Sequence, residues 1–134
     1  MLLSNAEVDF IDNARIARFA TCNTGLPHVV PVSHVFDRKT SSIYFVTDYG
    51  TKKLRNLKAN NRVAMVFDEY MEKSMGLMVE GEATYMEKGP EYMRIRKLLY
   101  EKFPQYHRPE LHFEEGEAPI VKITPTKTFS WGIK

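Results

Sequence analysis

The sequence contains one cysteine, Cys22, so the chain cannot form an internal disulfide. Small secreted domains usually depend on several disulfides, and their absence favours a reducing compartment. No apolar run approaches the ~20 residues that a helix needs to span a membrane. The apolar start at Met1 is followed at once by polar residues, which makes it too short and too polar for a signal peptide. We therefore expect a cytoplasmic protein that does not contact a membrane.

The chain also lacks a strong excess of charge of one sign. Its 19 lysines and arginines oppose 17 acidic residues, which gives a formal net charge of +2. Proteins that bind nucleic acid usually carry a basic domain or stripe, so nucleic acid is a poor candidate partner. The length of 134 residues and the ordinary apolar and charged fractions indicate one globular domain, residues 1–134.

What the sequence does contain is a series of short apolar segments with period-two alternation, separated by turn residues. They predict strands over residues 15–21, 27–36, 42–47, 62–67, 76–85 and 119–125, and a strand-like tail over 126–131. Helices are expected after a capping box at Ser4 and Glu7, over residues 52–60, and over 88–102. Consecutive strands are linked mostly by turns and not by helical crossovers. The sequence therefore predicts a mainly β protein, a small antiparallel barrel with peripheral helices.

Three details of these strands are specific predictions. Alternation in the first strand indicates that Ile16 and Phe19 face inward. Pro31 cannot donate a ladder hydrogen bond, so its strand should be interrupted or lie at a sheet edge. Gly81, inside a long strand, indicates a β-bulge or a close approach of another backbone.

The turn before residue 52 carries an unusual charge pattern. An apolar strand ends, the chain reverses at Gly50, and a helix begins with Lys52, Lys53 and Arg55 in its first turn. The helix N-terminus already carries a partial positive charge, so cations there are unfavourable unless an anion sits among them. Amide N–H groups together with lysines form a phosphate site. The sequence therefore predicts a phosphate-bearing ligand at this turn.

The order of motifs resembles one known family over about residues 13–132. The motifs are G-x-P-H-x-x-P-V from residue 25, Y-F-V-T from 44, T-K-K-x-x-N-L from 51, V-E-G-x-A from 79 and K-I-x-P-T-x-x-x-x-W-G from 122. This set is similar to the FMN-binding split-barrel family related to pyridoxamine 5′-phosphate oxidase. The resemblance implies an antiparallel split β-barrel, a homodimer, and two FMN molecules in grooves at the dimer interface.

The resemblance also implies which residues contact the cofactor. One strand is expected to run beside the isoalloxazine ring and offer it backbone groups, through Val30, Pro31, Val32 and Ser33. The contact pair at the end of the next strand matches Val46 and Thr47. The basic pair on the ribityl phosphate matches Lys52 and Lys53. An aromatic residue that approaches the flavin from the other subunit matches Trp131.

The departures from the family pattern limit the function. The Arg-Pro-x-x-Ser-Gln element of pyridoxamine phosphate oxidase itself is not matched by the helix over residues 91–102. The family's glutamine contact to the flavin ring falls near Gly76, which has no side chain. We therefore expect a flavin-dependent oxidoreductase with an unidentified small-molecule redox substrate, and not a vitamin oxidase.

Three alternatives stay open at this point. The same fold could use a deazaflavin, whose longer acidic tail would need further cations such as Arg55 and Lys58. A non-catalytic flavin- or haem-binding module is also compatible with the resemblance, and a small nucleic-acid-binding barrel is a remote possibility. No metal-ligand spacing is present, and we expect His28 and His34 to be surface or groove residues, with His34 at the end of the flavin-facing strand, on the substrate side.

Overall fold

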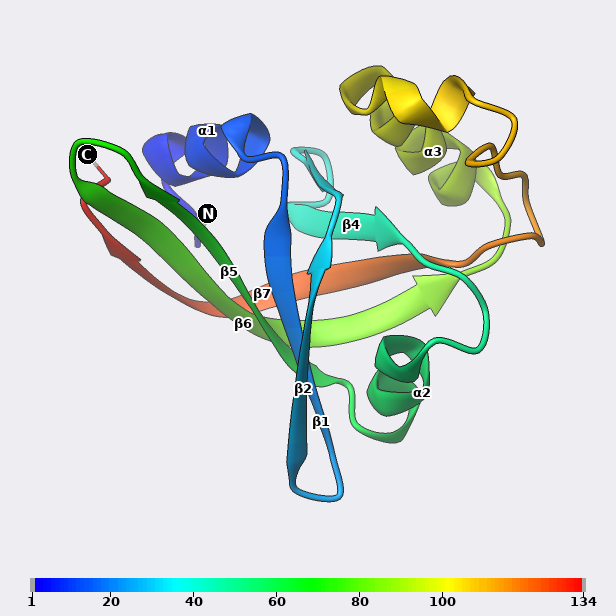
Figure 1. The fold of residues 1–134 in the computed structure, drawn as a ribbon, viewed down its shortest axis with the longest axis horizontal. Helices are drawn as coiled ribbons and strands as arrows, with labels where there is room; N and C mark the ends of the chain where they lie inside the picture. Colours follow the sequence, from blue (N-terminus) through cyan, green and yellow to red (C-terminus); the bar gives the residue numbers. More distant parts are fainter. Residues whose placement is uncertain (1, 134) are drawn as a thin grey trace.

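The computed structural model describes residues 2–133 and shows a mainly β protein (Figure 1). Its strands are β1 (Ala17–Asn23), β2 (Leu26–Val32), β3 (His34–Asp37), β4 (Ser42–Val46), β5 (Arg62–Tyr70), β6 (Ser74–Met86) and β7 (Ile120–Trp131). Its helices are α1 (Asn5–Asn13), α2 (Lys52–Ala59), α3 (Pro90–Lys102) and a short 3-10 helix, η1 (Pro104–His107). No helix within residues 2–133 is long and apolar enough to cross a membrane.

The strands form one sheet in the order β2-β1-β5-β6-β7-β4-β3, and every neighbouring pair is antiparallel. The two edge strands, β2 and β3, are consecutive in the chain and are separated only by Ser33. The sheet curls into a half-barrel whose seam is closed by the covalent chain (Figure 1). The predicted antiparallel split barrel is therefore confirmed. Pro31 lies in edge strand β2, as its missing N–H requires.

Two hydrophobic clusters lie on opposite faces of β3, β4 and β7. The larger cluster fills the barrel and includes Phe19 and Phe45, with Leu54 from α2. The smaller cluster lies between these strands and α3 and includes Tyr44 and Tyr92. β3 and β4 are consequently buried on both faces, which explains why the apolar run of β4 shows no alternation.

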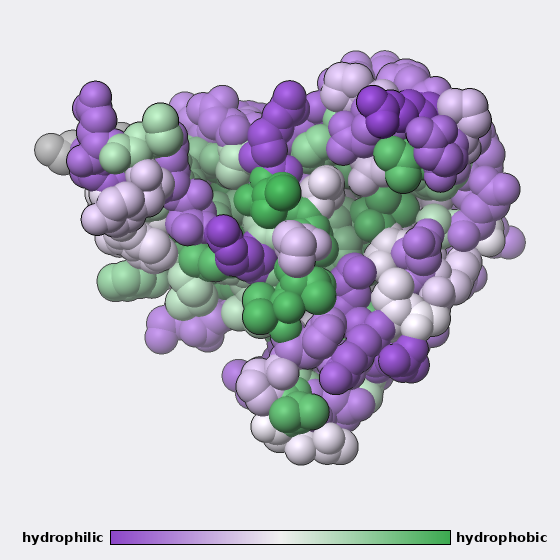
Figure 2. Space-filling model, in the orientation of Figure 1, coloured by the Kyte–Doolittle hydropathy of each residue, from purple (hydrophilic) through white to green (hydrophobic). Residues whose placement is uncertain are grey.

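The outer face of β2, β1, β5, β6 and β7 is left open to solvent. One cross-strand row on this face consists of Pro31, Arg18, Val66, Met78 and Phe129. We call this surface the outer sheet face, and it also carries Ile16, Val29 and Trp131. Phe129 is 62% exposed and Val29 63% exposed. Figure 2 shows hydrophobic residues at the surface over β2 and the start of β1.

The predicted irregularity at Gly81 is confirmed. The register between β6 and β7 shifts between Glu80 and Gly81, which is a β-bulge. A Cβ atom on Gly81 would lie 2.5 Å from the carbonyl oxygen of Thr124, so only glycine fits.

The expectation of two separate segments near the C-terminus is wrong, because β7 continues through Pro125 to Trp131. Pro125 pairs with Gly81 at the bulge. β4 pairs with β7 only up to Ile123, so proline removes no ladder bond on that side.

The prediction that Ile16 faces inward is also wrong. β1 begins one residue later, and its buried side chains are Ala17, Phe19 and Thr21. Ile16 is 53% exposed and lies before the strand, in phase with outward-facing Arg18.

The C-terminal ends of α1 and α3 lie side by side and are joined by hydrogen bonds. Arg15 Nη1 donates to the carbonyl oxygen of Lys102 at 2.9 Å, and Lys102 Nζ donates to the carbonyl oxygen of Ile11 at 3.5 Å. Each helix end thus receives a cation from the other segment. His34 lies beneath this junction, fully buried, with Nε2 2.9 Å from the same Ile11 oxygen. The expectation that His34 lines a surface or groove on the substrate side is therefore wrong.

Candidate functional site

The candidate site is built on the turn that joins β4 to α2. Gly50, at φ 82°, lets the chain reverse, and Thr51 is the N-cap of α2. The Thr51 side chain makes no cap hydrogen bond, and the first turn of α2 contains no acidic residue. The first amide N–H groups therefore lack a side-chain cap at the positive end of the helix dipole, beside Lys52 and Lys53. This is an arrangement that binds an anion.

Two hydroxyl groups fix the shape of the turn. Thr47 is buried, and its backbone N–H donates to the carbonyl oxygen of Pro119 at 3.1 Å. The Oγ1 atoms of Thr47 and Thr51 are 3.2 Å apart, and the Thr51 hydroxyl donates to the carbonyl oxygen of Asp48 at 3.2 Å. The hydroxyl that would cap α2 is thus used within the turn. The sequence did not point to Thr51, although Thr before a helix is a recognisable N-cap signal.

The two lysines of the pair differ in environment. Lys52 is exposed, whereas Lys53 is half-buried. Burial lowers the pKa of Lys53, and the nearby carboxylate of Asp48 partly opposes this shift. Among residues 2–133, no carboxylate lies within 4.0 Å of the Lys53 ammonium group. Lys53 therefore presents a partly desolvated charge without an ion-pair partner.

Lys53 lines a hollow of about 430 Å³, which we call the α2 hollow. One wall comes from β4, the turn and α2, and consists of Val46, Thr47, Asp48, Thr51 and Lys53. The other wall comes from the segment after α3, and consists of Tyr106, Glu110, Leu111, His112, Phe113, Glu117 and Ala118. Its volume is that of a small-molecule site. The structure thus brings together Val46, Thr47 and Lys53, three of the predicted cofactor residues.

The second wall comes from a segment for which the sequence predicted neither a helix nor a strand, and α3 fixes its position. Arg96 Nε donates to the carbonyl oxygen of Phe113 at 2.8 Å, and the Arg96 guanidinium lies 4.3 Å from the ring centre of Tyr100. The backbone N–H of Phe113 donates to the Tyr100 hydroxyl at 3.0 Å. The same hydroxyl is 2.8 Å from Nδ1 of His112. These contacts hold the segment opposite the start of α2.

None of the four predicted ring-binding residues, Val30, Pro31, Val32 and Ser33, lines the hollow. Val32 is buried and Val30 partly buried in the barrel core, so their side chains are not available to a ligand. Pro31 is exposed and Ser33 is partly exposed. Ser33 directly precedes β3, whose first residue pairs with Phe45 of β4, the residue before Val46. Ser33 and Val46 are therefore at the same end of the β3–β4 pair.

Trp131 is not brought to these residues within one chain. It lies on the outer sheet face at β7, four strands from Pro31 on β2, which is about 19 Å at ~4.8 Å per strand. Its indole covers Gly76, where any Cβ atom would overlap the ring, and its Nε1 donates to Ser74 Oγ at 3.1 Å. The indole thus occupies the space that a side chain at residue 76 would need.

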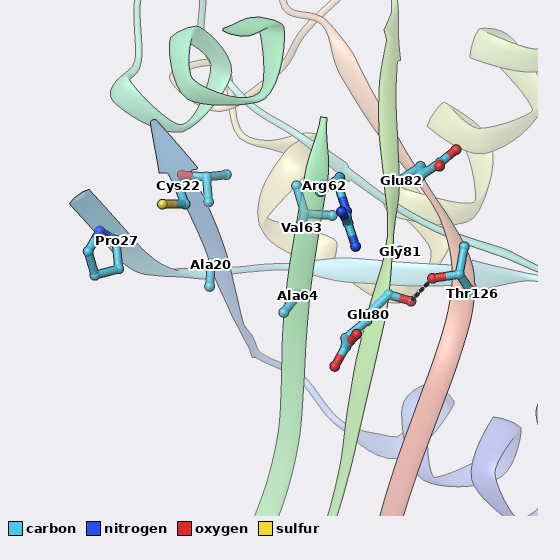
Figure 3. A pocket seen from close by; sticks show the side chains of 11 residues that line it. Ala20, Cys22, Pro27, Arg62, Val63, Ala64, Glu80, Gly81, Glu82 and Thr126 are labelled. Atoms are coloured by element: carbon cyan, nitrogen blue, oxygen red, sulfur yellow. Dashed lines mark hydrogen bonds between the residues drawn. The ribbon is translucent and has the colours of Figure 1, made fainter. Parts of the chain in front are cut away.

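A larger hollow, about 660 Å³, lies elsewhere, on the outer sheet face. Figure 3 shows small residues, Ala20 and Ala64, on neighbouring strands, with the Arg62 side chain lying between β5 and β6. Cys22, the free cysteine, is at its border. None of the predicted cofactor residues lines this depression, so we do not assign the ligand to it.

Comparisons with known proteins agree with this fold. The family model described as pyridoxamine 5′-phosphate oxidase matches residues 3–132. A comparison with curated proteins gives no match. Among solved structures, a conserved hypothetical protein of Mycobacterium tuberculosis is 22% identical with a TM-score of 0.80, over 98% of this chain and 86% of that chain.

Two further structures of similar fold bind different groups. The haem storage protein HutZ of Vibrio cholerae is 17% identical with a TM-score of 0.80, over 99% of this chain and 97% of its own. A FAD-binding protein of Mesorhizobium loti is 20% identical with a TM-score of 0.76, over 96% of this chain and 93% of its own. These identities show a shared fold, and the family model covers nearly the whole chain. The protein is a member of the pyridoxamine 5′-phosphate oxidase family.

Proposed function

We propose that this protein binds FMN and acts as a flavin-dependent oxidoreductase on a small molecule that is not yet identified. The observation that supports the proposal is the start of α2. Its first amide groups have no side-chain cap and lie beside two lysines, which is a favourable arrangement for binding an anion. The family membership and the FAD-binding protein of similar fold support a flavin as the source of that anion.

Each group of residues has a place in this proposal. Lys52 and Lys53 neutralise the ribityl phosphate, and the backbone of Pro31–Ser33 and Val46–Thr47 positions the ring and the ribityl chain. A bound flavin supplies the hydride or electron transfer itself. Lysine neutralises a phosphate as a point charge, without the two-pronged hydrogen bonding of arginine, so we expect affinity here to depend strongly on salt.

We further propose that the functional unit is a homodimer. The outer sheet face exposes Phe129 and Val29 beside a row that is apolar except for Arg18, and such a face favours burial against another protein surface. Pro31 and Trp131 lie on this same face at opposite sides. Two copies that pack outer face to outer face can therefore bring Trp131 of one copy towards the cofactor groove of the other.

The proposal is tested by purifying the full chain and recording its absorbance spectrum before and after adding FMN. We expect a flavin spectrum, or tight binding of added FMN seen as quenching of flavin fluorescence. A colourless protein that does not bind added FMN would show that the proposal is wrong.

The alternatives are separated by parallel titrations. Deazaflavin and haem are titrated under the same conditions as FMN, because a haem storage protein shares the fold. Oxidation of a reduced nicotinamide by the flavin-loaded protein would argue against a non-catalytic carrier. Binding of haem alone, with a haem spectrum, would favour the carrier.

A further inference from the structure

We propose that the α2 hollow selects a flavin that ends in a single phosphate and rejects one with a longer acidic tail. The selecting groups are the carboxylates of Asp48, Glu110 and Glu117. This inference rests on the proposed flavin function and names the ligand class and the residues that determine it.

The first observation is the charge of the hollow. Three carboxylates line it, from Asp48, Glu110 and Glu117, and Lys53 is the single lysine or arginine among the lining residues that the structure describes. Among residues 2–133, Asp48, Glu110 and Glu117 have no ion-pair partner within 4.0 Å. Glu117 accepts only a backbone N–H, from Glu114 at 2.7 Å. The carboxylates therefore remain free to repel an incoming anion.

The histidine in the hollow does not offset these charges. His112 lies 2.8 Å from Glu114 through Nε2, and Nδ1 is 2.8 Å from the Tyr100 hydroxyl. When His112 is protonated, its charge is consequently paired with the Glu114 carboxylate. Glu114 in turn accepts from Arg96 at 3.0 Å, so the positive charges on this wall already have a partner.

The second observation is that the two walls are close enough for a charge on one wall to act on a group of the other. The carboxylate of Asp48 raises the pKa of Lys53 on its own wall against the effect of burial. The same carboxylate contributes to raising the pKa of Tyr106 on the opposite wall, after burial and Tyr100. A tail that left the start of α2 and entered the hollow would pass between Asp48 and the acidic segment.

The third observation is that the further cations of α2, Arg55 and Lys58, do not line the hollow. The Arg55 guanidinium folds back and donates to the carbonyl oxygen of Gly50. The Lys58 ammonium lies 5.0 Å from the ring centre of Tyr85, as a cation–π contact. A compact phosphate needs only Lys52, Lys53 and the first amides of α2. An acidic tail that entered the hollow would meet three carboxylates and, among residues 2–133, Lys53 as the single lysine or arginine of the lining.

The experiment compares FMN with a deazaflavin that carries an oligoglutamate tail. Both dissociation constants are measured by fluorescence titration at low and at physiological salt, with the full chain. The test variant is the triple substitution Asp48→Asn, Glu110→Gln and Glu117→Gln. Each new side chain keeps the shape of the old one, and glutamine at residue 117 can still accept the N–H of Glu114.

The control is a second triple variant, Glu69→Gln, Glu72→Gln and Glu101→Gln. It removes the same number of exposed carboxylates at positions that do not line the α2 hollow. Net charge changes equally in both variants, so only a local effect separates them. Thermal unfolding of both variants verifies that they are folded.

We expect the wild-type protein to bind FMN more tightly than the acidic-tailed cofactor. The test variant should shift the ratio of the two dissociation constants towards the tailed cofactor by about threefold to tenfold at low salt, and less at higher salt. A ratio that moves equally in both variants, or a wild-type preference for the tailed cofactor, would overturn the inference while leaving flavin binding intact. Failure to bind either cofactor would overturn the proposed function itself.

Discussion

The Nε2 atom of His34 lies 3.4 Å from the ammonium nitrogen of Lys102, and both approach the carbonyl oxygen of Ile11. Burial, and secondarily the Lys102 charge, lower the pKa of His34 to about 4. Burial lowers the pKa of Lys102 to about 8. The contact with a carbonyl oxygen places the imidazole proton on Nε2, and Nδ1 is buried with no hydrogen-bond partner among residues 2–133. His34 is therefore a neutral core residue that joins α1, β3 and α3.

This neutral histidine predicts a pH-dependent stability. The pKa is about 4 in the folded protein against an ordinary value of 6.5, so the unfolded chain binds the proton first as pH falls. The His34 contribution should be complete above pH 6.5 and lost progressively down to pH 4. The total loss should be on the order of 3 kcal/mol. Urea unfolding at several pH values between these limits measures it.

The control for this prediction is a His34→Phe variant, which fills a similar volume without a titrating group. Its free energy of unfolding should fall less steeply between the two pH values. An unchanged slope would show that another group controls acid stability.

The contact between Trp131 and Gly76 predicts a sharp steric effect. A Gly76→Ala substitution should displace the indole and cost about 1–3 kcal/mol of stability, since the new Cβ atom has no space. Trp131 is the single tryptophan of the chain, so intrinsic fluorescence reports its displacement directly. A Ser74→Ala variant, which removes only the Nε1 hydrogen bond, should change fluorescence less. An indole signal unaffected by Gly76→Ala would contradict the packing.

The phosphate role of the lysine pair predicts unequal effects on FMN binding. Lys53→Met should weaken binding by roughly tenfold or more, which corresponds to about 1.4 kcal/mol. Lys52→Met should have a smaller effect that fades with salt, because Lys52 is exposed and better screened. Lys97→Met, on the exposed side of α3, is the matched control. Equal FMN affinity in all three variants would show that the phosphate of FMN does not bind at this turn.

The exposed outer sheet face predicts how the proposed dimer is disrupted. Phe129→Glu places a carboxylate beside the apolar Met78 and should convert the dimer to a monomer in size-exclusion chromatography with light scattering. Met93→Glu changes another exposed apolar residue, on α3 and outside the sheet, and should leave the dimer intact. If the Phe129→Glu protein remains dimeric, the interface lies on another surface.

Local patterns in the sequence predicted most of the fold, because each depends on neighbouring residues. The capping box is present, with the Ser4 side chain accepting from the Glu7 N–H at 3.1 Å and the Glu7 carboxylate accepting from the Ser4 N–H at 2.9 Å. Pro31 is at an edge and Gly81 at a bulge, since a missing N–H and a missing Cβ each restrict where a residue fits.

Two of the three errors involve partners distant in sequence. Pro125 was expected to end a strand. It is tolerated inside β7 because β4 pairs with β7 only up to Ile123. His34 was expected near the surface, and only the meeting of α1 and α3 buries it. The error at Ile16 is local, because Ile16 lies one residue before β1 and is in phase with the outward-facing Arg18 and not with the buried Phe19.

The candidate site also has one part that the sequence predicted and one part that it did not. The turn of Lys52 and Lys53 was recognisable because its charges contradict the helix dipole. The wall made by residues 106–118 was not, because nothing in that polar segment indicates what it faces. Its position depends on Arg96 and Tyr100, which reach it from α3.

The place of β7 in the sheet has a consequence for biosynthesis. The strands β2, β1, β5 and β6 form one half of the sheet and β4 and β3 the other, and β7 alone pairs with both halves. Both halves leave the ribosome before β7, so β6 and β4 each present an unpaired edge to other chains for that time. A chain that stops at Glu117 should consequently aggregate or bind chaperones, and light scattering during refolding would detect this.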